Sequence, residues 1–158
     1  MKRLVLIAVI IALAAGAAIA EEVPVWVSAG LKLGHIFGKG GGFTWGVEAS
    51  VVGWVADQRV PLGLVCDYDF CHGRERLHLG LEGCWTAFGA DVGPTWSLGK
   101  DSTSVGLTVT PFLSLAIPIL YYSETYYAQR SVPELGCYLK LPVPANHAAN
   151  HMFDWSND

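Results

Sequence analysis

The sequence predicts an all-β fold, an eight-stranded antiparallel up-and-down barrel preceded by an export signal. Apolar residues recur at every second position from Val23 onward, which is the side-chain period of a β-strand. Turn-forming residues interrupt this alternation seven times and so divide the chain into eight segments. Because no sustained helical period appears after the N-terminal run, we predict no helix in the mature part of the chain.

The N-terminal segment has the pattern of a secretory signal. A basic start at residues 1–3 precedes an apolar run over residues 4–20, which ends in the small-residue pattern Ala-Ile-Ala. The alternative is an uncleaved transmembrane helix, since the run is just long enough to span a bilayer. The small residues followed by two glutamates favour cleavage. We therefore expect three parts: a signal peptide at residues 1–20, a barrel at residues 21–144 and a flexible tail at residues 145–158.

The composition argues against several classes of function. The net charge is −4, and acids and bases are spread along the chain, so nothing predicts a surface for nucleic acid. Export would place the cysteines in an oxidising compartment, where disulfides are allowed. The predicted strand pairing brings no two cysteines directly opposite each other, so we expect no intramolecular disulfide. The four cysteines are Cys66, Cys71, Cys84 and Cys137.

Alternation sorts each segment into an apolar face and a polar face, and a slip of one residue would exchange them. The polar face carries Gly, Ser and Thr together with the strand charges. The seventh segment is the least clear, and we assign Ile119 and Tyr121 to its apolar face and Tyr122 to its polar face. The ionisable residues of the polar face form a predicted compensating network: Lys32, Glu48, Asp67, Asp69, Arg76, His78, Glu82, Asp91, Glu124, Glu134 and Lys140.

Alternation alone does not say which face points outward, because a soluble lipocalin-like barrel alternates with its apolar face inside. Three features favour the inverse arrangement, with the apolar face against lipid. Small residues and compensating charges suit a narrow lumen. The interior of an eight-stranded barrel is too narrow for the large apolar set. Aromatic residues of the apolar face gather toward segment ends, as interfacial girdles do: Phe43, Trp45, Tyr68, Phe70, Trp85, Phe88 and Trp96.

Two prolines fall on the apolar face, Pro94 in the fifth segment and Pro111 in the sixth. Proline has no N–H and removes one ladder hydrogen bond. We therefore expect bulges or local distortions at both positions.

An export signal, eight alternating segments and a short chain together resemble the small outer-membrane barrels of the OmpA and OmpX type, in architecture only and over residues 23–143. The resemblance implies a bacterial outer-membrane location, with outer-membrane lipids and the barrel-assembly machinery as partners. Members of that group normally close the last strand with an aromatic residue. Here the last clear strand is followed by a tail, in which Phe153 and Trp155 are poor substitutes.

No motif in the sequence predicts a metal or a cofactor. Cys66, Cys71 and His72 resemble part of a zinc site, with His78 following. Four-ligand zinc sites more often use tighter cysteine pairs, and strand parity puts Cys66 and Cys71 on opposite faces. We therefore predict no metal site and no cofactor.

A lumen enzyme is the chemical alternative. His78, Glu82, Asp91 and Ser97 share the polar face, as an acyl-transfer enzyme of the outer membrane would require. A charge-compensated plug that satisfies buried polar groups explains the same residues, and we favour it. We predict a non-enzymatic structural or adaptor barrel first, a barrel for a small or lipidic ligand second and a lipid-modifying enzyme third. A soluble periplasmic ligand-binding barrel is the competing location.

Overall fold

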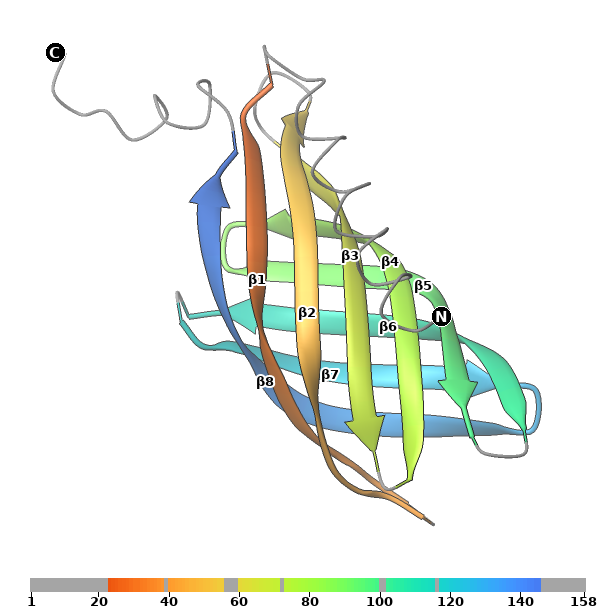
Figure 1. Ribbon diagram of the computed structural model, residues 1–158. Coiled ribbons are helices and arrows are strands. Elements are labelled where there is room, and N and C mark those ends of the chain that lie inside the picture. The colour runs from red at the N-terminus through yellow and green to blue at the C-terminus, as the bar shows by residue number, and fades with distance from the viewer. Residues whose placement is uncertain are drawn as a thin grey trace, which may run out of the picture.

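Figure 1 shows the computed structural model of the chain, in which one antiparallel sheet closes into a barrel. The structure describes residues 23–38, 40–55, 60–71, 73–99, 102–115 and 117–145. The predicted signal peptide and nearly all of the predicted tail therefore lie outside the described residues. The strands are β1 (Val25–Ile36), β2 (Gly42–Val55), β3 (Val60–Cys71), β4 (Arg74–Trp85), β5 (Phe88–Leu98), β6 (Thr103–Ser114), β7 (Ile119–Tyr127) and β8 (Arg130–Pro144).

The barrel closes because β1 pairs with β8 as well as with β2. The closing ladder runs from Trp26 opposite Pro144 to Ile36 opposite Glu134. In Figure 1 the strands β1 to β3 cross in front of β6 and β7 at a steep angle, which reflects the tilt that closure of a sheet requires. The predicted all-β fold of eight antiparallel strands closed into a barrel is thus confirmed. The described part of the chain contains no helix of the length and apolarity that a membrane-spanning helix needs.

The connections between strands form two rims. The terminal rim holds the chain ends of the barrel and the connections β2–β3, β4–β5 and β6–β7, and the distal rim holds the other four connections. In the β1–β2 connection, Gly38 and Gly40 have φ angles of +94° and +76°, a left-handed conformation that a residue without a Cβ adopts at little cost.

The two prolines interrupt the ladder without shifting it. Between β4 and β5 two consecutive positions are skipped, those at which Leu79 would face Pro94 and Gly80 would face Gly93, and pairing resumes in the same register. Between β6 and β7 the positions at which Thr110 would face Ser123 and Pro111 would face Tyr122 are skipped in the same way. The expected local distortions are therefore confirmed as gaps in pairing. A bulge, the other expected form, is not what occurs at these positions, because a bulge would change the register.

The predicted faces are confirmed in β1 to β6 and in β8, and the apolar face points outward. On β3, for example, Leu64 is 53% exposed whereas Asp67 and Asp69 are each 2% exposed. Large apolar side chains thus cover the outer wall, and charged side chains fill the lumen. A lipocalin-like barrel has the opposite arrangement, so that alternative does not fit the structure.

The predicted faces of β7 are wrong. Tyr121 and Ser123 point inward and are buried, whereas Tyr122 is 42% exposed and points outward. Glu124 also points outward, so it does not belong to the lumen network. Its carboxylate accepts a hydrogen bond of 2.9 Å from the Tyr122 hydroxyl on the outer wall. The error arose because β7 carries large apolar or aromatic side chains on both faces, so its alternation in hydrophobicity has little contrast.

Candidate functional site

The lumen is the candidate site because it gathers the predicted ionisable residues apart from Glu124. All of these side chains are 9% exposed or less. They come from six strands around the barrel, which places charges from distant parts of the sequence in one closed volume. The buried set is Lys32, Glu48, Asp67, Asp69, Arg76, His78, Glu82, Asp91, Glu134 and Lys140.

The distal half of the lumen holds a chain of alternating charges. The Lys32 ammonium group lies 2.9 Å from a carboxylate oxygen of Asp67 and 3.0 Å from one of Asp69. The Arg76 guanidinium group lies 2.8 Å from the same Asp69 oxygen and also pairs with Glu134. The chain crosses the barrel from β3 to β8, so it ties opposite walls together. Buried charges of this kind are tolerated only when they are paired and hydrogen-bonded.

The terminal half of the network is centred on Lys140. Its ammonium group pairs with Glu48 and lies 3.6 Å from a carboxylate oxygen of Glu82. The same group lies 5.4 Å from the centroid of the Tyr138 ring and 6.0 Å from that of Phe112, within the range of cation–π attraction.

Two stacked tyrosines fill the centre of the lumen between these clusters. The rings of Tyr121 and Tyr138 have centroids 4.5 Å apart and planes at 29°. The Lys32 ammonium group lies 5.2 Å from the Tyr121 centroid, and the Tyr121 hydroxyl donates to Glu134. Sequence reasoning missed Tyr121 because it placed that residue on the lipid-facing side. The β7–β8 register identifies the inward face of β7, because it places Ser123 opposite the inward Glu134.

Carboxylates exceed cations among the described lumen residues. The three cations are Lys32, Arg76 and Lys140, and the six carboxylates are Glu48, Asp67, Asp69, Glu82, Asp91 and Glu134. Glu48 lies directly opposite Asp67 in the β2–β3 register, on the same face. One carboxylate oxygen of each has no hydrogen-bond partner within the described structure. The predicted charge compensation is therefore only partial.

A chain of side-chain hydrogen bonds runs along the lumen face of β4, β5, β6 and β7. His78 bonds Asp91 through Nε2 and Thr95 through Nδ1, each at 2.8 Å. Thr95 bonds Thr108 at 2.5 Å, and Thr108 bonds Thr125 at 2.8 Å. This chain, the lumen belt, crosses the β4–β5 and β6–β7 seams at which the prolines remove backbone pairs. Side-chain hydrogen bonds therefore replace part of the lost ladder.

The belt contains the order acid, histidine and hydroxyl that an acyl-transfer enzyme would use. The hydroxyl is that of Thr95 and the carboxylate that of Asp91, so the described hydrogen bonds of His78 do not involve the predicted Ser97 or Glu82. Thr95 is 3% exposed, and its hydroxyl is shared with Thr108. A substrate carbonyl would have to enter the packed lumen to meet this hydroxyl, so the arrangement suits structural support better than catalysis.

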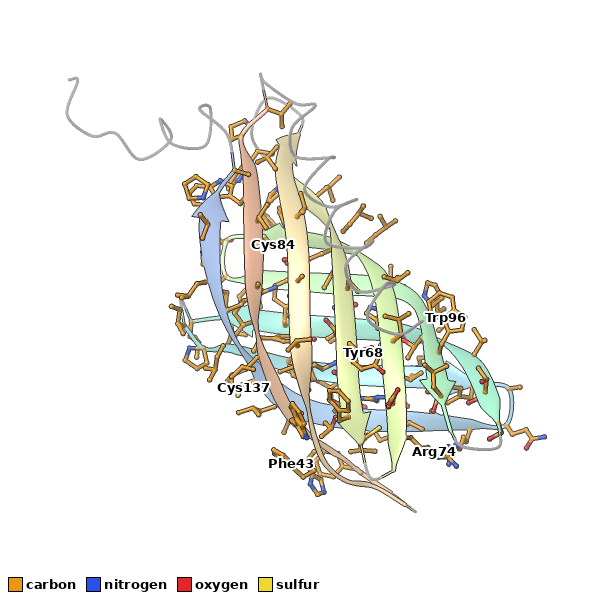
Figure 2. The ribbon with its side chains drawn as sticks, viewed as in Figure 1. Phe43, Tyr68, Arg74, Cys84, Trp96 and Cys137 are labelled. Carbon is orange, nitrogen blue, oxygen red and sulfur yellow. The ribbon has the colours of Figure 1, made fainter. Side chains whose placement is uncertain are left out.

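The predicted aromatic girdle residues all point outward, and they fall into two groups. Trp85 and Phe88 flank the β4–β5 turn at the terminal rim and are 82% and 69% exposed. The other group lies in the distal half, where the Trp45 and Phe70 rings stack with centroids 4.6 Å apart. Phe43, Tyr68 and Trp96 complete it, and Figure 2 shows these three on the outside of the barrel.

The cysteines are free thiols and stand apart from one another. Cys71 has inward parity, and Cys66 has the outward parity of Leu64 although only 5% of it is exposed. Figure 2 shows Cys84 and Cys137 well separated on the barrel. Within the described residues, no group of three or more His, Cys, Asp or Glu side chains is arranged to hold a metal ion.

Comparison with known proteins finds similarity only in solved structures. No protein-family model and no curated protein matches the chain. Neisserial surface protein A aligns at a TM-score of 0.49 and 15% identity, over 74% of this chain and 96% of that one. The attachment invasion locus protein of Yersinia pestis, in complex with the heparin analogue sucrose octasulfate, aligns at 0.35 and 12% identity, over 76% and 99%. The closed eight-stranded architecture of this chain is given by its own strand pairing.

Proposed function

We propose that the mature chain is a bacterial outer-membrane β-barrel with a structural or adaptor role, a closed lumen and no catalytic activity. The observation that carries this proposal is the inside-out distribution of side chains. Leu81, Trp85 and Leu141 are 65%, 82% and 63% exposed on the outer wall, while paired charges fill the interior. A soluble protein rarely exposes so continuous an apolar surface.

A bilayer suits this surface for a second reason, which concerns the backbone. In hydrocarbon, backbone N–H and C=O groups must be bonded within the protein, and a closed barrel achieves this without free edges. The β1–β8 ladder removes the edges here. Outer-membrane lipids are therefore the primary partners that we propose, together with the barrel-assembly machinery that would insert the chain.

The packed lumen supports a closed barrel and not a pore. Arg76, Lys32, Tyr121 and Tyr138 are all 5% exposed or less, Arg76 donates to Asp69, and the Lys32 ammonium group lies over both tyrosine rings. An ion that crossed the barrel would have to displace these paired groups. The short distal connections also leave little surface for receptor-like recognition, which favours an adaptor or structural role.

Membrane fractionation followed by a heat-modifiability gel tests the location. We expect the chain in the outer-membrane fraction, with a shift in gel mobility between unheated and boiled samples because folded barrels resist SDS. Recovery in the soluble periplasmic fraction would remove the proposal. Conductance of the purified barrel in a planar bilayer tests the closed lumen, and steady channel currents would contradict it.

A lipid-modifying enzyme is the second candidate, and the His78 geometry is the observation that favours it. His78 lies between Asp91 and Thr95, at 2.8 Å from each. If this site were catalytic, Thr95→Val and His78→Gln would each abolish a change in lipid acylation that the wild type produces. We expect the lipid profiles of wild type and both variants to be the same.

A further inference from the structure

The outer wall of the barrel carries a carboxylate in its distal half, that of Glu124 on β7. Glu124 is partly exposed and lies between Tyr122 and Tyr126, the neighbouring outward residues of the strand, which are 42% and 52% exposed. The Tyr122 hydroxyl donates a hydrogen bond of 2.9 Å to this carboxylate. An ionisable side chain on a lipid-facing surface is unfavourable, so its position there indicates a partner that offsets the cost.

The wall positions around Glu124 supply no cation. Val109 on β6 and Pro133 on β8 lie directly opposite it in the two ladders. Its diagonal neighbours on these strands are also uncharged: Leu107, Pro111, Ser131 and Leu135. None of the ion pairs among the described residues includes Glu124. An ionised carboxylate accepts more than one hydrogen bond, so the bond from Tyr122 uses only part of its capacity.

The outer wall offers no Lys or Arg of its own within the described strands. Lys32, Arg76 and Lys140 are buried in the lumen. Arg74 and Arg130 begin β4 and β8 and have the inward parity of those strands. A second copy of the chain, packed wall against wall, would therefore bring apolar side chains to Glu124. A cation that pairs with this carboxylate must come from a different molecule.

Glu124 lies close to the depth at which lipid headgroups meet a spanning strand. β7 ends at Tyr127, three residues beyond Glu124, and a short connection at the distal rim leads to β8 (Figure 1). Three residues of a strand cover about 10 Å, and the tilt of a closed barrel shortens that distance along its axis. Tyr126, the next outward residue toward the rim, is of a type enriched at membrane interfaces. A headgroup can therefore reach the carboxylate from the distal side.

A second pair of tyrosine and carboxylate lies in the same half of the wall. Glu75, the second residue of β4, accepts a hydrogen bond from Tyr68 on β3. Glu75 has a further interaction as well, whereas the described side-chain hydrogen bond of Glu124 is the one from Tyr122. The outward positions in the terminal half of the described strands carry no charged residue. Outward charge is thus confined to the distal half, and Glu124 has the capacity for an outside partner.

The small size of this polar patch favours a small partner group. The patch consists of Tyr122, Glu124 and Tyr126 on one strand, with Ser131 opposite Tyr126 on the next. A specific contact between two proteins buries about 1,000 Å² or more, which requires a broader set of complementary groups. An ammonium group needs only an acceptor and adjoining ring faces. The patch therefore fits a single headgroup better than the surface of a protein.

We propose that Glu124, with Tyr122 and Tyr126 beside it, binds the primary ammonium group of a phospholipid headgroup, as in phosphatidylethanolamine. The ammonium N–H groups donate to the carboxylate, and the tyrosine rings attract the positive charge. In a bilayer of phosphatidylcholine alone, whose headgroup has no N–H donor, the outward charge lacks this partner. The proposal rests on the membrane location proposed above and names the lipid class that the distal half of the wall prefers.

Native mass spectrometry of the full chain, refolded in a nonionic detergent, tests this preference. A heat-modifiability gel first establishes that each sample is folded, and phosphatidylethanolamine and phosphatidylcholine with the same acyl chains are then added in equal amounts. We expect the wild type to retain phosphatidylethanolamine about fivefold more than phosphatidylcholine, which is the scale of one partly exposed ion pair. Glu124→Gln should bring this ratio close to one. Asp101→Asn is the charge-matched control, since residue 101 falls between β5 and β6 in the sequence, and it should keep the wild-type ratio.

Three outcomes would overturn the proposal: equal retention of both lipids by the folded wild type, a wild-type ratio in Glu124→Gln, or an equal loss of preference in Asp101→Asn. Each would leave a basic side chain of a partner protein as the cation for Glu124 to meet. Membrane fractionation of the wild type separates these failures from a wrong location. A chain found in the outer membrane but without the lipid preference contradicts only the headgroup site, whereas recovery in the soluble fraction would remove both proposals.

Discussion

At the scale of single residues, whether a charged side chain stabilises or destabilises the barrel depends on whether it points into the lumen or away from it. Glu134 points inward, is 0% exposed and is bonded by Arg76 and Tyr121. Glu124 points outward, where its described hydrogen bond is to Tyr122 on the same strand. The two carboxylates lie on neighbouring strands, so they provide a matched pair for testing which side of the wall meets lipid.

Glu124→Gln and Glu134→Gln should therefore have opposite effects on stability. Removing an outward charge from an apolar wall should raise the free energy of unfolding by about 1 kcal/mol. Removing the Glu134 charge breaks a buried ion pair and should lower that free energy by about 3 kcal/mol. Urea unfolding in phosphatidylcholine vesicles measures both. Destabilisation by the two variants to the same extent would contradict the assignment of Glu124 to the lipid face.

At the scale of elements, the lumen belt compensates for the two proline gaps. Thr108 lies at its centre and bonds Thr95 on β5 and Thr125 on β7. The belt thus supports the β6–β7 seam, where Pro111 removes a backbone pair. Side-chain hydrogen bonds and backbone pairing therefore both hold this side of the barrel together.

Thr108→Val should destabilise the barrel by about 1 to 3 kcal/mol, because its two hydroxyl partners lose a bond in a buried site. Thr110→Val is the control, since Thr110 is also inward and 2% exposed but lies outside the belt. Unfolding midpoints in urea compare the two. Equal midpoints for both variants would show that the belt adds nothing to the strength of the seam.

The elements also show how far the sequence predicts this molecule and where it does not. A strong contrast in polarity between the two faces predicts the orientation of β3 and β8 correctly. The charged side chains mark the inward face of each strand: Asp67 and Asp69 on β3, Glu134 and Lys140 on β8. β7 lacks such contrast, and its faces follow from pairing with β8 instead. The belt and the tyrosine stack were not predictable from alternation, since they depend on which inward side chains meet across the lumen.

At the scale of the whole molecule, one closed sheet separates an apolar exterior from a charged interior. Closure joins β1 to β8, and the lumen network then ties opposite walls together. The proposed membrane location and the closed lumen both depend on this separation. A test of the separation itself is therefore the most direct test of the account.

Quenching of tryptophan fluorescence by lipids with brominated acyl chains provides that test. One variant keeps Trp45, which is 48% exposed on the outer wall, as its sole tryptophan, and a second keeps the inward Trp54. We predict strong quenching of the Trp45 variant in bilayers and little quenching of the Trp54 variant. Quenching of Trp54 as strong as that of Trp45, or the absence of quenching in both folded variants, would contradict the claim that the apolar face meets acyl chains.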